Sequence, residues 1–186
     1  MRTGLLRPEL IAVTEDHCVA GRARTALCGQ GDNLAVHRVM ELVQPGDGVV
    51  LAMPETRPTA LAGDLLAPQA KVRGAAALLV DAAVQDRDEI AAMGLAVWAR
   101  WVHARGAETC DPGALGCPVT VGGVEIADGD VVVLDADAVV VVPATTVEAT
   151  LAASESSFRK EEGLRGRLEA GDLTLDLMSL RPEAVK

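Results

Sequence analysis

Aromatic residues are almost absent from this sequence, which has two Trp, one Phe and no Tyr in 186 residues. Hydrophobic residues nevertheless make up 49% of the chain, so a core has to be filled by Ala, Val and Leu. Such side chains favour closely packed α/β layers over an aromatic-rich β-sandwich. The length suits one domain, and we therefore expect a single α/β domain over residues 1–186.

Positive charge is also scarce. The chain has 17 Lys and Arg against 27 Asp and Glu, which gives a formal net charge of −10. Binding to nucleic acid depends on a Lys and Arg footprint that displaces counterions, and binding to single strands also depends on aromatic faces for base stacking. We therefore expect no nucleic-acid partner.

Long hydrophobic runs are missing. The longest, residues 138–144, contains Pro143 and is far too short to span a bilayer, and Arg2 and Arg7 lie in a start without a continuous apolar stretch. We expect neither a membrane segment nor a secretory signal.

The four cysteines form no Cys-x-x-Cys pair and have no His at zinc-finger spacing, which favours reduced thiols in a cytoplasmic protein. A disulfide or metal clip joining Cys110 and Cys117 is the alternative. The sequence also lacks a His-Glu-x-x-His motif, a Gly-x-Ser-x-Gly elbow and a complete Gly-x-Gly-x-x-Gly motif.

What is present is an alternation of strand-like and helix-like segments in the first half of the chain. This order predicts a βαβ-containing parallel or mixed sheet with helices packed against it. The expected strands are residues 18–27, 49–53, 77–81 and 96–99, and the expected helices are residues 33–43, 60–73 and 86–93.

The second half has a different texture. Short apolar runs separated by Gly and Asp predict a β meander over residues 118–121, 124–126, 131–134 and 139–142. Residues 145–171 are helical in pattern but carry few apolar positions and many charges. We expect residues 145–186 to form a helix and tail at a subunit interface, and residues 1–16 to be peripheral.

The first candidate site is the segment Gly63-Asp64-Leu65-Leu66, a glycine-containing entry to a helix. Free backbone N–H groups and the helix dipole at such an entry can hold a carboxylate or phosphate. An ordinary helix start with an acidic capping residue is the alternative.

The second candidate is the segment from Val80 to Asp86, in which a strand leads into a helix. Carboxylates at the carboxyl end of a parallel strand are well placed for a ligand or a hard metal ion. In the alternative interpretation Asp86 only caps the following helix and Gln85 is an exposed loop residue.

These two segments, in this order and with Ala70–Gly74 between them, resemble the class II 4-hydroxy-4-methyl-2-oxoglutarate / 4-carboxy-4-hydroxy-2-oxoadipate aldolase family, which includes the regulator of ribonuclease activity A-like proteins. The resemblance extends from about Cys18 to the end of the sequence. It is supported by residues 31–38, 44–47, 118–119, 122–124, 129–133, 135–143 and 171–176.

The resemblance implies an α/β/β/α sandwich with a central βαβ unit, assembled as a homotrimer or hexamer with Mg²⁺ or Mn²⁺ at the subunit interfaces. Members cleave 4-hydroxy-2-oxo acids to pyruvate and a second 2-oxo acid, and many decarboxylate oxaloacetate. The metal polarises the 2-oxo group and stabilises the enolate that forms.

The resemblance also assigns roles to individual residues. Asp86 matches the metal-binding aspartate, and Glu161 matches the acidic residue that one subunit contributes to the metal shell of its neighbour. The amides of Leu65 and Leu66, which follow Gly63, match those that bind the substrate carboxylate, with Asp64 beside them.

This sequence departs from the family pattern at the residue before Asp86. The family has an arginine there, which contacts the substrate carbonyl oxygen, whereas this chain has Gln85. Gln is a neutral donor and cannot offer a charged fork. Thr109 stands where a lysine is frequent, Ala138 replaces a frequent glycine, and Arg87 would point about 200° away from residue 85 on a helix.

Three functions are therefore open. The chain is a metal-dependent lyase of 2-oxo acids with an atypical site, an enzyme that uses the same metal site for another reaction on a carboxylate substrate, or a non-catalytic regulator that binds a protein. Retention of Asp86 and Glu161 favours an enzyme.

Overall fold

The computed structural model describes residues 4–6, 9–14 and 18–181. The chain divides into two compact units, Met1–Ala144 and Thr145–Lys186. This division falls where the sequence pattern turns helical, and each unit is described by itself. The prediction that residues 145–186 lie at a subunit interface stays a prediction.

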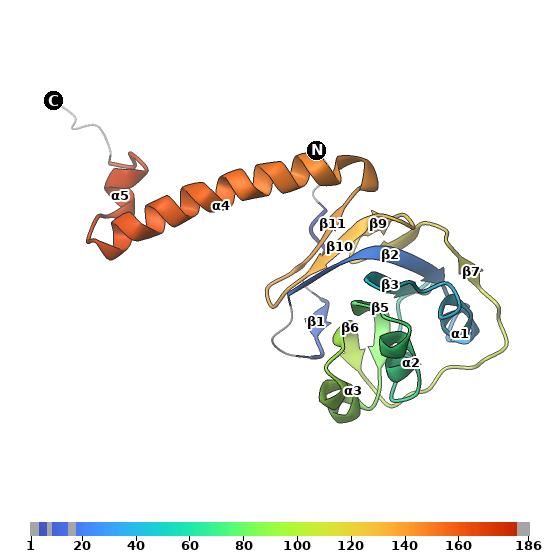
Figure 1. Cartoon of the computed structure of the whole chain (residues 1–186). Helices are drawn as coiled ribbons and strands as arrows, with labels where there is room; N and C mark the ends of the chain where they lie inside the picture. Colours follow the sequence, from blue (N-terminus) through green and yellow to red (C-terminus); the bar gives the residue numbers. More distant parts are fainter. Residues whose placement is uncertain (1–3, 7–8, 15–17, 182–186) are drawn as a thin grey trace. The chain divides into compact units, whose positions relative to one another are not determined.

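Four parallel strands form the centre of the first unit. They are neighbours in the order β6-β5-β3-β2, and helices connect them along the chain (Figure 1). All eight residues of β5 are buried, as expected for a strand covered on both faces of its sheet. Their bounds are β2 (Val19–Leu27), β3 (Asp47–Ala52), β5 (Ala77–Val84) and β6 (Ala96–Val102).

Shorter strands extend this sheet at both ends. Beside β2 lie β10 (Val131–Leu134) and then β11 (Val139–Val142), both antiparallel to their neighbours, while β1 (Ile11–Ala12) pairs antiparallel with β6. The predicted meander is divided between two sheets, because β8 (Val119–Val121) and β9 (Val124–Ile126) form a separate two-stranded antiparallel sheet and β9 does not pair with β10. The short strand β7 (Ala114–Leu115) pairs with β2.

Each face of the sheet packs on its own apolar cluster. Helices α1 (Leu34–Val39), α2 (Leu66–Val72) and α3 (Arg87–Met93) bury Val36, Ala67 and Ile90 in one cluster with strand residues such as Leu78. Trp98, Val121 and Ile126 belong to the cluster on the other face. The predicted class, a mixed α/β fold with a curved sheet and helices, is confirmed (Figure 1).

The predicted helix over residues 60–73 is wrong in its first part. Residues Ala60–Ala62 form a short strand, β4, which is followed by a turn before α2 begins at Leu66. The expected end of β5 at Asp81 is wrong for a related reason, because β5 continues to Val84.

Both errors have one physical origin. Strand β3 pairs with β5 only as far as Val80, so the last residues of β5 would have an open edge. β4 occupies this edge by pairing with Ala83 and Val84 in parallel. Three small buried residues are compatible with either a helix or a strand, and only the unpaired edge of β5 decides between them.

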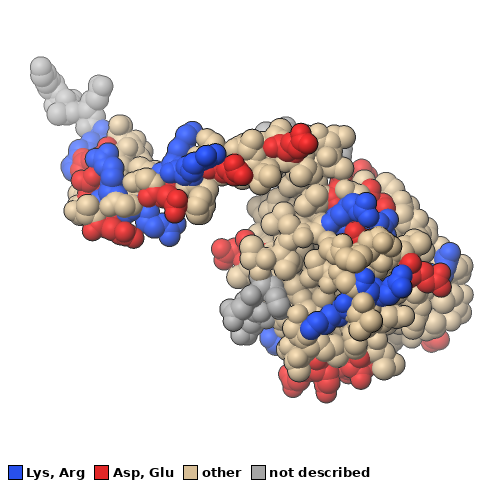
Figure 2. Space-filling view, in the orientation of Figure 1, with Lys and Arg blue, Asp and Glu red and all other residues tan. Residues whose placement is uncertain are grey.

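The second unit contains the helices α4 (Val147–Glu169) and α5 (Thr174–Leu177), preceded by a short 3-10 turn at Ala144–Thr146. Neither helix has a buried residue. Side chains of both signs are interspersed along this unit in Figure 2, and Glu155 pairs with Arg159 one turn later. No helix in the described part of the chain has the length and apolar character needed to cross a membrane.

Candidate functional site

Gly63 lies in the turn between β4 and α2 and has no room for a side chain. A Cβ at this position would lie 2.6 Å from Asp86 Oδ2 and 2.7 Å from Gln85 Cγ. These distances are shorter than real Cβ contacts, so the Asp86 and Gln85 side chains can occupy their present positions only because residue 63 is a glycine. The predicted turn at Gly63 and the predicted acidic segment after β5 are therefore in contact.

Asp86 adopts a backbone conformation that is rare for a residue with a side chain. Its φ of 57° and ψ of 48° are left-handed, which costs about 1–2 kcal/mol for an L-residue. It occupies the N-cap position of α3, but its side chain makes no capping hydrogen bond. Instead, Asp86 Oδ2 accepts a hydrogen bond from the backbone N–H of Asp64 at 3.2 Å. The alternative that the carboxylate only caps α3 is wrong.

Gln85 is held between the same two segments. Its backbone N–H donates to the carbonyl oxygen of Ala62 at 3.1 Å, which continues the β4–β5 pairing. Its side-chain Nε2 would lie 3.2 Å from a Cβ at position 63. Gln85 is half-buried, so it is not the freely exposed loop residue of the alternative interpretation.

Leu65 and Leu66 begin helix α2 immediately after the Gly63 turn. Leu65 is the N-cap residue and is 81% exposed, whereas Leu66 is 6% exposed and packs in the core. The first amides of a helix have no acceptor within the helix. These two residues therefore place amides directly after Asp64 at the start of α2, and the binding of a substrate carboxylate by these amides stays a prediction.

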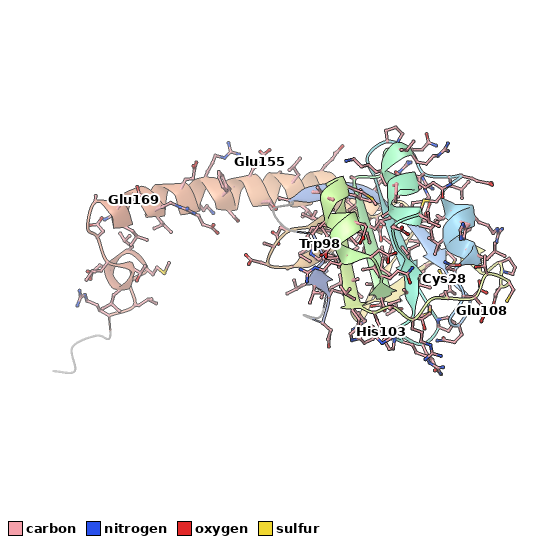
Figure 3. All side chains as sticks on the ribbon, turned by 90° about the horizontal axis from the view of Figure 1, so that it is seen from below. Cys28, Trp98, His103, Glu108, Glu155 and Glu169 are labelled. Atoms are coloured by element: carbon pink, nitrogen blue, oxygen red, sulfur yellow. The ribbon has the colours of Figure 1, made fainter. Side chains whose placement is uncertain are left out.

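A third segment, residues 103–106, reaches the same edge of the sheet and was not singled out as a site by sequence. The N–H of His103 donates to the carbonyl oxygen of Val84 at 2.9 Å, and the N–H of Ala60 donates to the carbonyl oxygen of Arg105 at 2.7 Å. Figure 3 shows His103 just beyond the end of β6. The only signal in the sequence is its position after a parallel strand, since the carboxyl ends of such strands meet at one edge.

Asp81, the other carboxylate of the predicted acidic segment, has a different environment. It lies within β5 and is 3% exposed, and its carboxylate accepts hydrogen bonds from Arg100 Nε at 2.5 Å and from Thr56 Oγ1 at 3.1 Å. Breaking a buried pair of this kind leaves an uncompensated charge. Asp81 therefore stabilises the strand that carries Gln85 and Asp86.

The loop before α1 contains Asp32, a second carboxylate that accepts several hydrogen bonds. Burial acts to raise the pKa of Asp32, but hydrogen bonds from the N–H groups of Leu34, Cys110 and Asp111, and from the Cys110 thiol, lower its pKa from 3.8 to about 2. Two of these bonds measure 2.8 Å for Leu34 and 2.7 Å for Cys110. This carboxylate links the loop to the segment after residue 106.

Thr109, which stands where the family often has a lysine, is part of the same connection. Its Oγ1 donates to Asn33 Oδ1 at 2.8 Å, and Asn33 Nδ2 donates to the carbonyl oxygen of Leu61 in β4 at 3.4 Å. Thr109 thus contributes to the structure around β4 and offers no positive charge.

The four cysteines are all free, so the disulfide alternative for Cys110 and Cys117 is wrong. Burial raises the pKa of the Cys28 thiol to about 12, with further contributions from the nearby charges of Asp32 and Asp111. A hydrogen bond with Asp32 likewise raises the pKa of the Cys110 thiol.

The metal-binding prediction rests on Asp86 and Glu161. Glu161 lies on α4 in the second unit and is exposed. Within residues 4–6, 9–14 and 18–181, no group of three or more His, Cys, Asp or Glu side chains is arranged to hold a metal ion. A single carboxylate still fits Mg²⁺ or Mn²⁺ chemically, because Mg²⁺ is commonly held by one or two carboxylates together with waters and substrate oxygens.

The fold and this edge of the sheet define a class: a mixed α/β domain in which a glycine turn and a left-handed aspartate lie in contact at the carboxyl ends of parallel strands. Residues 1–141 match the family model RraA-like, described as Aldolase/RraA. The chain belongs to the Aldolase/RraA family, which confirms the resemblance predicted from the sequence.

Relatives of two kinds are similar to this chain. A protein of Halalkalibacterium halodurans, provisionally named 4-hydroxy-4-methyl-2-oxoglutarate aldolase, is 33% identical over 150 residues, which cover 81% of this chain and 71% of that protein. The structure of Streptomyces coelicolor RraAS2, described as an unusual member of the RNase ES inhibitor RraA family, is 29% identical with a TM-score of 0.78, covering 89% of this chain and 84% of that one. The RNA-processing inhibitor RraA from Thermus thermophilus is 27% identical with a TM-score of 0.70, covering 76% and 86%.

Proposed function

We propose that this chain is a divalent-metal-dependent lyase that acts on a 2-oxo acid, by retro-aldol cleavage of a 4-hydroxy-2-oxo acid or by decarboxylation. The relatives named as aldolases support this reaction class at the level of the family. The observation that carries the proposal is the contact between Asp86 and the Gly63-Asp64 turn, for which this chain accepts a left-handed aspartate and excludes a Cβ at position 63.

Strain of this kind costs stability and is concentrated at functional sites. A carboxylate needed only to cap α3 would adopt an ordinary extended N-cap conformation and bond to the helix amides. Asp86 does neither. Its position is explained if the carboxylate has to face a ligand bound beside the turn.

Each residue then has a distinct task. The amides of Leu65 and Leu66 bind the carboxylate next to the 2-oxo group, and Gln85 directs its amide N–H towards the carbonyl oxygen. Asp86, with Glu161 from a neighbouring subunit, would hold Mg²⁺ or Mn²⁺. Asp64 lies beside the proton that is transferred during the reaction. The cation, when bound, supplies Lewis acidity that polarises the 2-oxo group and stabilises the negative charge developing on it.

The neutral Gln85 makes this site weaker than one with an arginine. Removing one donor directed at a developing oxyanion typically costs about 10²–10³ in rate. We therefore expect slow turnover of standard substrates. In a variant of this proposal, the same residues act on a different 2-oxo acid. They could also catalyse a reaction such as isomerisation or hydration, which does not depend on a charged donor.

The experiment compares the wild type with Asp86→Asn in two assays, oxaloacetate decarboxylation and exchange of the pyruvate methyl protons in D₂O, each with added Mg²⁺ or Mn²⁺. Asp88→Asn is the matched control, because Asp88 is an exposed carboxylate in the first turn of the same helix. We expect loss of metal-dependent rate in Asp86→Asn alone. Equal rates in wild type and Asp86→Asn would refute the assigned role.

A second function, regulation of a ribonuclease by protein binding, is supported by the relatives described as RraA inhibitors and by the absence of an arginine at position 85. The two functions differ in their dependence on metal. A ligand that binds only the folded state raises the melting temperature. An increase with millimolar Mg²⁺ or Mn²⁺ that disappears in Asp86→Asn favours the lyase, and no shift favours the regulator.

A further inference from the structure

Nearly every basic side chain in the described part of the first unit is engaged by an acceptor. Four arginines pair with carboxylates, and three further basic side chains donate to backbone carbonyls. The engaged residues are Arg22, Arg24, Arg57, Arg100, Arg38, Lys71 and Arg73. Among the described Lys and Arg residues of this unit, only Arg87 and Arg105 make no side-chain hydrogen bond or ion pair.

Both of these free guanidinium groups belong to segments at the edge of the sheet that carries Asp86. Arg87 follows Asp86 directly and is the first residue of α3. Arg105 lies on the segment that bonds to Val84, the last residue of β5, and to Ala60, the first residue of β4. They differ in their surroundings, because Arg87 shares its helical turn with Asp88 and Glu89, whereas the neighbours of Arg105 in the chain, Ala104 and Gly106, are uncharged.

The backbone of Arg105 is fixed although its side chain is free. Its carbonyl oxygen accepts the N–H of Ala60 in β4 at 2.7 Å, and its own N–H donates to His103 Nδ1 at 3.0 Å. His103 is in turn bonded to Val84, the last residue of β5, through its backbone N–H. Because the backbone of Arg105 is already held by these hydrogen bonds, it loses little conformational entropy when the guanidinium binds an anion.

The charge of the site indicates what this anion is. At the turn, the backbone of Asp64 contacts the Asp86 side chain and Gln85 lies beside it, so the residues that meet here are two acids and a neutral amide. A substrate with one carboxylate can use the amides of Leu65 and Leu66. A second carboxylate at the far end of the substrate would meet only negative or neutral side chains unless a guanidinium binds it.

We propose that Arg105 binds the distal carboxylate of the 2-oxo acid substrate and thereby selects dicarboxylic over monocarboxylic 2-oxo acids, with His103 as its positioning residue. This inference rests on the proposed function. A guanidinium binds a carboxylate through two parallel hydrogen bonds, so it adds selectivity as well as affinity. His103 contributes through the nitrogen that accepts the Arg105 N–H, which leaves the hydrogen of the neutral ring on the other nitrogen.

The test measures binding to the full-length protein by isothermal titration calorimetry with Mg²⁺ present. The two probes are 2-oxoglutarate and 2-oxopentanoate, which have the same chain length and differ only in a carboxylate or a methyl group at the far end. Neither has the 4-hydroxyl group of an aldol substrate, so binding is observed without cleavage. The variants are Arg105→Gln, Arg87→Gln and Arg57→Gln, and the last is the control because Arg57 already pairs with Glu55.

We expect the wild type to bind 2-oxoglutarate more tightly than 2-oxopentanoate. Arg105→Gln should lose about 10- to 100-fold in affinity for 2-oxoglutarate, the range for one charge-assisted hydrogen-bonded contact, and keep its affinity for 2-oxopentanoate. Arg87→Gln and Arg57→Gln should retain the preference. Three outcomes would overturn the inference and leave the proposed function intact. These are equal affinity of the wild type for both probes, an unchanged preference in Arg105→Gln, and loss of the preference in Arg87→Gln instead.

If the wild type binds neither probe in the presence of Mg²⁺, the proposed function itself fails and this inference falls with it. The role of His103 is tested separately. In His103→Asn the side-chain oxygen replaces the accepting nitrogen and should keep the preference for 2-oxoglutarate, whereas His103→Ala should reduce it without changing the affinity for 2-oxopentanoate. A loss of affinity for both probes in His103→Ala would indicate a general structural effect and refute the positioning role.

Discussion

The carboxylate of Asp86 accepts a hydrogen bond from the backbone N–H of Asp64, 22 residues earlier in the chain. The two residues follow neighbouring parallel strands, β4 and β5, and the bond is made with Asp86 in a left-handed conformation. Because Gly63 has no Cβ, the two segments approach closely enough for this contact. The predictions that follow depend on this arrangement and on the carboxylates and thiols around it.

Replacing Asp86 should separate function from stability. We expect Asp86→Gly and Asp86→Ala both to lose metal-dependent activity, because neither has a carboxylate. Asp86→Gly should be about 1 kcal/mol more stable than Asp86→Ala, since glycine adopts the left-handed conformation without the steric cost that alanine incurs. Urea denaturation of the two variants measures this difference. Equal stabilities would contradict the left-handed conformation of residue 86.

Adding one methyl group at position 63 should disturb the site more than the fold. In Gly63→Ala the new Cβ would lie 2.6 Å from Asp86 Oδ2 and 2.7 Å from Gln85 Cγ, so these side chains have to move. We expect the metal-dependent rate to fall at least about 10-fold, since small misplacements of catalytic groups are costly. We also expect most of the metal-induced rise in melting temperature to be lost. Gly163→Ala on α4, where a Cβ meets nothing within 4 Å, is the matched control. An unchanged rate in Gly63→Ala would show that the contact is unimportant.

Restoring an arginine should strengthen the lyase reaction. We expect Gln85→Arg to raise the rate of retro-aldol cleavage, because a charged fork replaces a neutral donor at the substrate carbonyl oxygen. The gain is measured as kcat with a 4-hydroxy-2-oxo acid and saturating Mg²⁺. Gln85→Lys is a useful comparison because it adds the same charge without the fork. A fall in rate for Gln85→Arg would mean that the site is adapted to another substrate.

Asp32 should make stability depend on pH in the acid range. The pKa of Asp32 is about 2 in the folded chain against 3.8 for an ordinary aspartate, so its contribution to stability is present above pH 3.8 and is lost as the pH falls towards 2. We expect Asp32→Asn to lower the free energy of unfolding by about 1–3 kcal/mol at neutral pH, because an N–H group of Leu34 or Cys110 loses its acceptor. The difference from the wild type should shrink between pH 3.8 and about 2. A difference that is constant over this range would contradict the lowered pKa.

The cysteines should differ in reactivity with iodoacetamide. The thiolate is the nucleophile, so a thiol with a raised pKa reacts slowly. Cys28 is buried with a pKa of about 12, and the pKa of Cys110 is raised by Asp32 although Cys110 is exposed. We expect Cys18 to react first, Cys110 later and Cys28 last, as followed by peptide mass spectrometry, with all four equally reactive in urea. Early modification of Cys28 would contradict its buried position.

The sequence alone was sufficient for much of this molecule. Periodicity predicted the parallel strands and α3, which ends at Met93 as expected and is followed by Gly94 in a left-handed conformation. The order of the two candidate segments was enough to indicate the family. These features depend on local spacing and on backbone conformations that few residues other than glycine adopt, so neighbouring residues in the chain determine them.

Tertiary structure decided the rest. Residues 60–62 form a strand because the end of β5 would otherwise lack a partner. The angle of about 200° expected between residues 85 and 87 on a helix does not apply, because Asp86 is left-handed and precedes α3. Likewise, only the fold leaves Arg105 as a fixed but unpaired cation beside β4. The residues at each of these places are distant in sequence, and whether an edge, a carboxylate or a guanidinium finds a partner depends on which segments the completed sheet brings side by side.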